Sequence, residues 1–186
     1  MIVRSEALKL LAGRRKGEVV ITTMSTIREW HAVTTNHDLD FPIQGAMGQA
    51  APVGLGVALA RPDKKVWILN GDGSQLMHLG SVASIAHNGA KNVVLFVFQN
   101  DTYEVTGGQP IPLAGKVDFA GAALALGFPR TYRFDEMAQL ESKLGEVLSG
   151  QGPVLVTLRV VPGDRFEPWR PKMLEEAAKF KRALQA

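Results

Sequence analysis

Short apolar segments alternate along this chain with longer segments of helical periodicity, and this alternation limits the possible folds more than any other feature. Several apolar segments have no polar position at all, as expected for strands covered on both faces of a sheet. We predict strands at residues 18–23, 65–70, 92–99, 130–134 and 153–161. We predict helices at residues 5–15, 26–33, 49–60, 74–88, 118–126 and 135–148.

Strands and helices that alternate in this way form a parallel sheet with right-handed crossovers. The sequence therefore predicts an α/β fold of three layers, with helices on both faces of a mostly parallel sheet. We expect the 186 residues to form a single domain, because this length suits one domain. A C-terminal tail is expected from about residue 162, with a short helix at 173–184. Ligands in such folds bind beyond the carboxyl ends of the strands.

Composition excludes several classes of protein. The chain has no cysteine, which excludes disulfide frameworks, thiolate zinc sites and cysteine nucleophiles. Apolar residues make up 46% and charged residues 21%, so a disordered chain is not expected. The apolar runs are too short to cross a bilayer, and no signal peptide is recognisable. We therefore expect a cytoplasmic protein that does not bind membranes.

The net charge of +3 is unevenly distributed. Residues 1–18 carry five basic and two acidic groups, and residues 164–186 carry six and four, so the central body is slightly negative. Nucleic-acid binding would require a basic stripe with interleaved aromatic residues on the folded body. We find no such stripe and expect no nucleic-acid partner. The basic termini are expected to be solvated or to contact a partner protein.

The turn that is most informative about function is Gly-Asp-Gly-Ser at residues 71–74, between a predicted strand and a predicted helix. Glycine lets the backbone approach a ligand closely, and the free N–H groups of a helix N-terminus suit phosphate. The carboxylate of Asp72 would repel a bare phosphate, but it fits if a divalent cation lies between them. Mg²⁺ is often held by one or two side chains together with phosphates. Asn100 ends the next predicted strand and is expected at the same sheet edge.

Two common nucleotide-binding loops are absent. Position 76 is Leu, so no Gly-x-Gly-x-x-Gly opens the helix, and no Gly-Lys-Ser/Thr occurs in the chain. A lone Gly-Asp-Gly is weak evidence, because Asp-Gly turns are common. Here it is followed, after 26 intervening residues, by an Asn at the next strand end, and this combination is much more specific.

Segments 71–74 and 99–102 together resemble the thiamine diphosphate-binding motif of thiamine-dependent decarboxylases, in their diphosphate-binding domain. The glycine-rich turn at 45–50 is similar to a turn of the same family, and the segments 45–60, 71–80 and 107–110 especially resemble phosphonopyruvate and sulfopyruvate decarboxylases. The resemblance covers about residues 18–160. One departure is that the usual Asn-Asn pair is Gln99-Asn100, in which only the second residue matches the metal ligand.

The resemblance implies a role for each matching residue. Mg²⁺ would be held by Asp72, by the side chain of Asn100 and by the backbone carbonyl of Thr102. The carbonyl of Gly45 would accept a hydrogen bond from the aminopyrimidine ring, and Met47 would lie under thiamine diphosphate and keep its two rings bent. The residues expected to bind the cofactor are Thr22, Thr23, Gly45, Met47, Gly71, Gly73 and Ser74, of which Thr22 is a weaker candidate than Thr23.

The activity implied by the resemblance is decarboxylation of a small anionic 2-oxo acid, such as 3-sulfopyruvate, which yields sulfoacetaldehyde and CO₂. No catalytic residue is expected in this chain, because the family's activating glutamate lies on a pyrimidine-binding domain that packs across a subunit interface. We expect a partner subunit to supply that domain, the chain to self-associate, and the isolated chain to be inactive.

Several alternatives remain open. The chain could belong to a related phosphonopyruvate decarboxylase, to a carboligase similar to acetolactate synthase, or to a non-catalytic module of the same fold. A flavodoxin-like nucleotide binder would show no Mg²⁺ dependence. We expect His78 to pack or face solvent and Glu104 to be a solvated loop carboxylate, whereas a substrate role is conceivable for His31 and His37.

Overall fold

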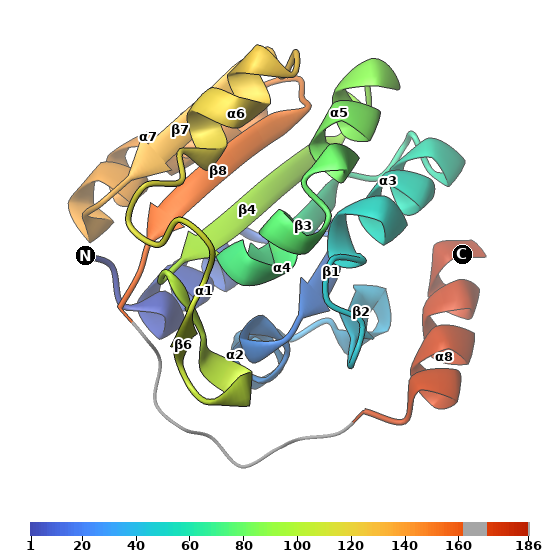
Figure 1. The fold of residues 1–186 in the computed structure, drawn as a ribbon. Helices are drawn as coiled ribbons and strands as arrows, with labels where there is room; N and C mark the ends of the chain where they lie inside the picture. Colours follow the sequence, from blue (N-terminus) through green and yellow to red (C-terminus); the bar gives the residue numbers. More distant parts are fainter. Residues whose placement is uncertain (162–170, 186) are drawn as a thin grey trace.

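A six-stranded parallel sheet forms the centre of the protein (Figure 1), which is described by a computed structural model for residues 1–161 and 171–185. Across the sheet the strands have the order β2-β1-β3-β4-β8-β7, and all neighbouring pairs are parallel. A separate antiparallel pair consists of β5 and β6. The strands are β1 (Val19–Thr23), β2 (Asp40–Ile43), β3 (Val66–Gly71), β4 (Val93–Gln99), β5 (Thr102–Tyr103), β6 (Gln109–Pro110), β7 (Arg130–Phe134) and β8 (Val154–Arg159).

Helices cover both faces of the sheet, which confirms the predicted three layers. One face packs against α1, α2 and α7, and the other against α3, α5 and α6, with α8 beside strand β2 (Figure 1). The helices are α1 (Arg4–Arg14), α2 (Ser25–Val33), α3 (Ala50–Ala60), α4 (Asp72–Met77), α5 (Gly80–His87), α6 (Phe119–Ala125), α7 (Met137–Ser149) and α8 (Met173–Gln185), and two 3-10 turns are η1 (His37–Leu39) and η2 (Glu104–Thr106). Within the described residues, no helix is both long enough and apolar enough to cross a bilayer.

Strands β1 and β4 are buried along their whole length, and β3 and β8 along all but their last residue, as their continuous apolar sequences predict. Alternate residues enter two separate cores, because successive side chains of a strand point to opposite faces. In β3, Ile68 packs with the helices α3, α5 and α6, whereas Trp67 packs with α1, α2 and α7. The ends of these rigid strands therefore form a fixed platform for the residues that follow them.

Two parts of the secondary structure differ from the predictions. Strand β2 was not predicted, because the polar Asp40 and the neighbouring Pro42 interrupt any apolar run; its outer edge is covered by α8, where Phe41 stacks on Phe180. The helix predicted at 74–88 is two helices, since the backbone leaves the helical conformation at His78. The predicted C-terminal helix at 173–184 is confirmed as α8, while residues 162–170 of the expected tail lie outside the described residues.

The basic N-terminal segment is not simply solvated, contrary to one of the two expectations for it. Arg15 forms an ion pair of 2.8 Å with Asp40 at the sheet edge. Arg4 is only 4% exposed. These two basic residues are therefore part of the folded body, and their charges are paired within it.

The close packing of α3 on β3 allows a test of the fold. A Cβ at Gly54 would lie 2.4 Å from Ile68 Cδ1, whereas a Cβ at Gly56, two residues further along the same helix, meets nothing within 4 Å. We expect Gly54→Ala to destabilise the chain by about 1–2 kcal/mol, because overpacking costs more than the gain in helix propensity. The control Gly56→Ala should stabilise it by about 0.5–1 kcal/mol. Urea unfolding measures both, and equal effects of the two changes would contradict the close contact.

Candidate functional site

An open cavity lies at the carboxyl edge of the central strands. Its wall comes from the start of α1, from the turns that follow β1 and β3, from Met47 and from the segment after β4. This is the sheet edge at which ligands bind in parallel α/β folds. Of the residues predicted from the sequence, Thr23, Met47, Gly71, Asp72, Gly73, Ser74, Asn100 and Thr102 line this cavity.

Asp72 and Asn100 follow adjacent strands. Strand β3 pairs with β4 in parallel, and Gly71 at the end of β3 is opposite Phe98 near the end of β4. Asp72 begins α4 directly after β3, and Asn100 directly follows β4. The predicted arrangement of neighbouring strand ends is therefore observed.

Asp72 is a buried carboxylate that lacks a counter-charge. It is 2% exposed, and its two oxygens accept hydrogen bonds from the backbone N–H groups of Gly73 (2.7 Å) and Asp101 (2.6 Å). Burial raises the pKa of Asp72 to about 6, against the opposing effect of these hydrogen bonds. No Arg, Lys or His among the described residues forms an ion pair with it. A bound cation would supply the missing charge.

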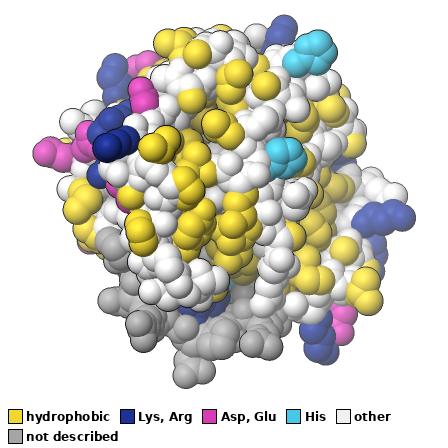
Figure 2. All heavy atoms as spheres, in the orientation of Figure 1, with side chains coloured by type: hydrophobic (Ala, Val, Ile, Leu, Met, Phe, Trp, Pro, Cys, Tyr) yellow, Lys and Arg dark blue, Asp and Glu magenta, His cyan; other side chains and the backbone are white. Residues whose placement is uncertain are grey.

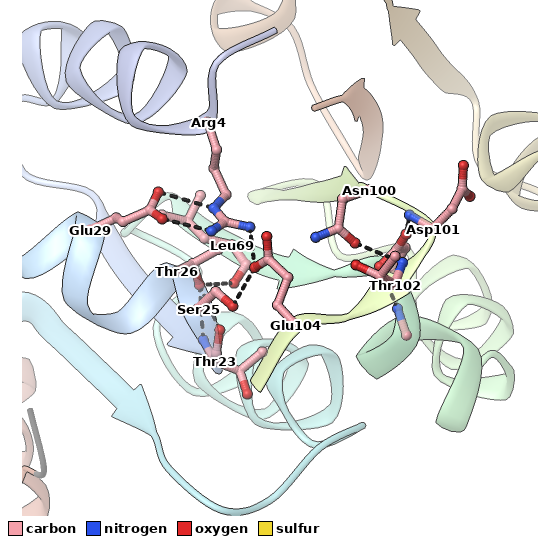
Figure 3. Close-up of polar contacts among 12 residues, drawn as sticks. Arg4, Thr23, Ser25, Thr26, Glu29, Leu69, Asn100, Asp101, Thr102 and Glu104 are labelled. Carbon is pink, nitrogen blue, oxygen red and sulfur yellow. Dashed lines mark hydrogen bonds and ion pairs between the residues drawn. The ribbon is translucent and has the colours of Figure 1, made fainter. Parts of the chain in front are cut away.

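The segment after β4 folds around Asp72. Asn100 Oδ1 accepts a hydrogen bond of 3.0 Å from the N–H of Thr102, which makes a local turn (Figure 3). Asp101 has a left-handed backbone with a φ of 62° and donates its N–H to Asp72. The carboxylate of Asp72, from the turn after β3, and the oxygens of Asn100 and Thr102, from the segment after β4, thus belong to the wall of one cavity, and oxygen donors of this kind suit Mg²⁺.

Gln99 replaces the first Asn of the usual motif, and its side chain forms hydrogen bonds to the segments on either side of the site. Its side chain is buried and donates to Asp101 Oδ1 at 3.0 Å and to the carbonyl of Val117 at 3.2 Å. Asp101 in turn pairs with Arg159 at 3.0 Å. With Gln in place of Asn at position 99, the segment around Asn100 is therefore still held in place by side-chain hydrogen bonds.

The start of α4 is held to the glycine-rich turn. Ser74 Oγ accepts a hydrogen bond of 2.9 Å from the N–H of Gly48. At Gly73 a Cβ would lie 2.4 Å from Tyr103 Cε1, so glycine is required for the loop after β4 to approach this closely. The start of a helix suits a phosphate, although the N–H of Gly73 donates to Asp72 in this structure.

Two predicted cofactor residues do not lie in the cavity wall. Thr22 faces a second, smaller cavity, together with His31 and His37, because adjacent strand residues point to opposite faces. Gly45 is exposed, with a φ of 73°, and does not line the main cavity. Thr23 does line it, and its hydroxyl donates to the carbonyl of Ile43.

The histidines lie outside the main cavity. The rings of His31 and His37 are in contact, with centroids 4.4 Å apart, beside Asp40. His78 is exposed, as expected, and its Nδ1 lies 3.2 Å from the carbonyl oxygen of Gly48. The geometry thus gives His31 and His37 no place in the candidate site.

Sequence reasoning missed a charged cluster in the cavity wall. Arg4 holds both carboxylate oxygens of Glu29, at 3.0 and 2.6 Å, and also contacts Glu104 Oε2 at 2.8 Å. The expectation of a solvated Glu104 is therefore wrong, since its side chain is only 15% exposed. Burial alone would lower the pKa of Arg4, but the two glutamates outweigh burial and raise the pKa. These ion pairs could not be predicted from the sequence, because the partners are 25 and 100 residues apart.

No group of three or more His, Asp or Glu side chains within the described residues could hold a metal ion. A cation in the main cavity would depend on amide and carbonyl oxygens beside the single carboxylate of Asp72. The donor set and the buried, unpaired charge fit the magnesium and diphosphate that the motif implies.

Residues 19–158 match the family described as thiamine pyrophosphate enzyme, C-terminal TPP binding domain. The chain belongs to this family, and its fold and the composition of its cavity agree with a domain that binds the cofactor.

Among curated relatives, the chain is 39% identical over 155 residues to phosphonopyruvate decarboxylase of Streptomyces hygroscopicus, a match that covers 83% of this chain and 38% of that protein. It is 31% identical over 169 residues to sulfopyruvate decarboxylase subunit beta of Methanothermobacter thermautotrophicus, covering 90% of this chain and 87% of that one. The chain thus spans well under half the length of the phosphonopyruvate decarboxylases it matches.

A solved structure shows the same fold. The benzoylformate decarboxylase of Polynucleobacter necessarius superposes with a TM-score of 0.73 at 20% identity, and the match covers 89% of this chain and 34% of that protein.

Proposed function

We propose that this chain is the thiamine diphosphate- and Mg²⁺-binding subunit of a 2-oxo acid decarboxylase and acts with a partner subunit. The observation that carries the proposal is the position of Asp72 and Asn100 at the ends of adjacent strands, in the wall of one cavity. A buried carboxylate without a basic partner is costly, and a divalent cation bound there would offset that cost.

Each group of cavity residues has a separate task in this proposal. Asp72, the Asn100 side chain and the Thr102 carbonyl hold Mg²⁺. The turn that contains Gly71, Gly73 and Ser74 receives the diphosphate at the start of α4, beside Thr23. Met47 offers an apolar surface to the rings of the cofactor. The contacts expected of Thr22 and of the Gly45 carbonyl stay predictions, since neither residue lines this cavity.

Thiamine diphosphate, when bound, supplies the electron sink that a 2-oxo acid needs in order to lose CO₂. The chain's own residues bind and orient the cofactor, and the surrounding cavity limits access of water. None of them is assigned a proton transfer. That task falls to a glutamate of the partner subunit.

Exposed apolar residues support the need for a partner. Figure 2 shows hydrophobic side chains gathered over the face of α3 to α6. Large exposed side chains of this region and of the loop after β4 include Leu59, Met77, Val105, Leu113, Leu124 and Leu126. Apolar patches of this kind mark interaction surfaces, so we assign this face to contacts with the partner subunit or a second copy.

Two substrates are favoured by different findings. The match to 87% of a sulfopyruvate decarboxylase beta subunit favours a two-subunit enzyme that acts on 3-sulfopyruvate. The higher identity to a phosphonopyruvate decarboxylase, 39% against 31%, favours phosphonopyruvate as the second candidate. Both are 2-oxo acids that carry a further anionic group.

The proposed function predicts that activity depends on the partner. We expect the chain alone to release no CO₂ from 3-sulfopyruvate, phosphonopyruvate or pyruvate, and the chain coexpressed with its pyrimidine-binding subunit to decarboxylate one of the first two when given thiamine diphosphate and Mg²⁺. Release of CO₂ from each acid is the measurement. Full activity of the isolated chain, or none of the reconstituted pair with any 2-oxo acid, would contradict the proposal.

A further inference from the structure

Asp101, in the segment after β4, has a contact for each of its polar groups. Its N–H donates to Asp72 Oδ2 at 2.6 Å, and its carbonyl accepts a hydrogen bond of 3.1 Å from the N–H of Ile111. Its Oδ1 accepts from Gln99 Nε2 at 3.0 Å, and its Oδ2 pairs with Arg159 Nη1 at 3.0 Å. Asp101 therefore links the proposed metal site to side chains that lie outside it.

The backbone of Asp101 has a conformation that is unfavourable for most residues. Its φ of 62° lies in the left-handed region, which only glycine adopts freely. Asp is tolerated there because its short polar side chain can form hydrogen bonds nearby. In this chain the carboxylate is held from two directions, by Gln99 of β4 and by Arg159 of β8. Both contacts fix the direction of the side chain and so favour this backbone.

Arg159 lies on a rigid part of the fold. It ends strand β8 and is opposite Gln99, the last residue of β4, in the parallel ladder. Its carbonyl accepts a hydrogen bond of 2.8 Å from the N–H of Ile2, which ties the end of this strand to the N-terminal segment. Neither Arg159 nor Asp101 lines the main cavity. A direct contact of the guanidinium with a cation in that cavity is therefore not part of its role.

We propose that Arg159 is a positioning residue for the Mg²⁺ site. It holds the Asp101 carboxylate, maintains the left-handed backbone and so aims the N–H of Asp101 at Asp72. The same conformation sets the path of the chain on both sides of Asp101, where Asn100 and Thr102 lie. The inference rests on the proposed function, because Mg²⁺ at Asp72, Asn100 and Thr102 belongs to that proposal.

Two other interpretations of the ion pair predict different results. The side chains of Arg159 and Asp101 are 22% and 18% exposed, and a pair without a positioning role would leave the site unchanged when it is lost, because ion pairs near the surface contribute little. A guanidinium that acted only through its charge would repel a nearby cation, so its removal would strengthen cation binding. Loss of a positioning residue weakens cation binding instead.

The test uses Mn²⁺ as a probe of the Mg²⁺ site, with the full chain and excess thiamine diphosphate, and follows bound Mn²⁺ by water proton relaxation. We expect Arg159→Met to weaken Mn²⁺ binding about tenfold, the effect of one charge-assisted hydrogen bond. Arg159→Lys keeps the positive charge and should weaken it less. The matched control is Arg133→Met on the neighbouring strand β7, which removes an exposed pair with Asp135 and should leave affinity unchanged. Unchanged or tighter binding by Arg159→Met overturns the proposal.

A second variant shows whether Arg159 acts through Asp101. Asp101→Gly removes the carboxylate but keeps the N–H, and glycine adopts the left-handed backbone readily. Adding Arg159→Met to Asp101→Gly should change the affinity for Mn²⁺ by less than about twofold, since the effects of two residues in contact are not additive. A further tenfold loss in the double variant would show that Arg159 acts elsewhere, contrary to the proposal.

A measurement without metal separates this inference from the proposed function. Hydrogen exchange followed by NMR reports how firmly the N–H of Asp101 is held against Asp72, and we expect Arg159→Met to speed this exchange about tenfold. The amide of Ile68, within β3, is the internal control for a general loss of stability and should exchange as before. A parent chain that binds no Mn²⁺ contradicts the proposed function, whereas an unchanged exchange rate of Asp101 in Arg159→Met overturns the positioning role.

Discussion

Asp72→Ala is expected to abolish Mg²⁺-dependent binding of thiamine diphosphate, with a loss of affinity of more than about 100-fold, because it removes the charged ligand of the proposed metal site. The chain should remain folded. Calorimetric titration with thiamine diphosphate, in the presence and absence of Mg²⁺, measures the loss, and circular dichroism verifies the fold.

The pKa of Asp72 explains why the fold should survive. Burial raises the pKa in the folded chain to about 6, above the ordinary value of 3.8, so the folded state disfavours the ionised carboxylate. This penalty is absent below the unfolded pKa of 3.8, grows between that value and the folded pKa of about 6, and is fully present at about pH 8. At that pH, Asp72→Ala relieves a penalty while it removes the hydrogen bonds from Gly73 and Asp101, so the two effects oppose each other.

The control for this change is Asp63→Ala. Asp63 pairs with Arg61 at 2.7 Å on the surface, away from the cavity, and its loss should leave binding unchanged. The metal assignment would be wrong if Asp72→Ala bound the cofactor as tightly as the parent chain with Mg²⁺ present.

The site residues that could be predicted from the sequence are those whose position depends only on topology. Asp72 and Asn100 follow consecutive parallel strands, and any parallel pairing of these strands brings their ends to one edge. The Gly-Asp-Gly turn also fixes its own local backbone. Neither conclusion requires knowledge of how side chains pack.

Side-chain direction was less predictable. Thr22 and Thr23 are adjacent and chemically identical, and both end an apolar strand. Only the pleat of β1 relative to the helices decides that Thr23 faces the main cavity and Thr22 the second one. Strand β2 was not predicted for the same reason, since its burial depends on a tertiary contact. Phe41 of β2 stacks on Phe180 of helix α8.

The Arg4 cluster could not be predicted at all from local patterns. Its contacts to Glu29 and Glu104 span 25 and 100 residues. In the sequence, Arg4 is one of five basic residues near a terminus, which usually indicates a solvated segment. Packing of α1 beside α2 buries it, and its ion pairs follow from that burial rather than from its neighbours in the sequence.

Arg4→Met is expected to destabilise the chain by about 3–5 kcal/mol, because it leaves Glu29 buried without a partner. Most of the loss should be recovered in the double variant Arg4→Met/Glu29→Leu, since replacing both members of a buried pair by apolar side chains of similar volume is often nearly neutral. Urea unfolding measures both variants. Arg133→Met is the control: Arg133 pairs with Asp135 at 3.4 Å and both side chains are about half exposed, so its effect should be below about 1 kcal/mol.

The comparison of these variants separates two explanations for the burial of Arg4. If the guanidinium stabilises the fold only by neutralising Glu29, the double variant regains stability. If Arg4 also packs irreplaceably between α1 and α2, the double variant stays as unstable as the single one, which would contradict the recovery predicted here. The Arg4–Glu29 pair would then contribute to the fold through the packing of its side chains rather than through its charges.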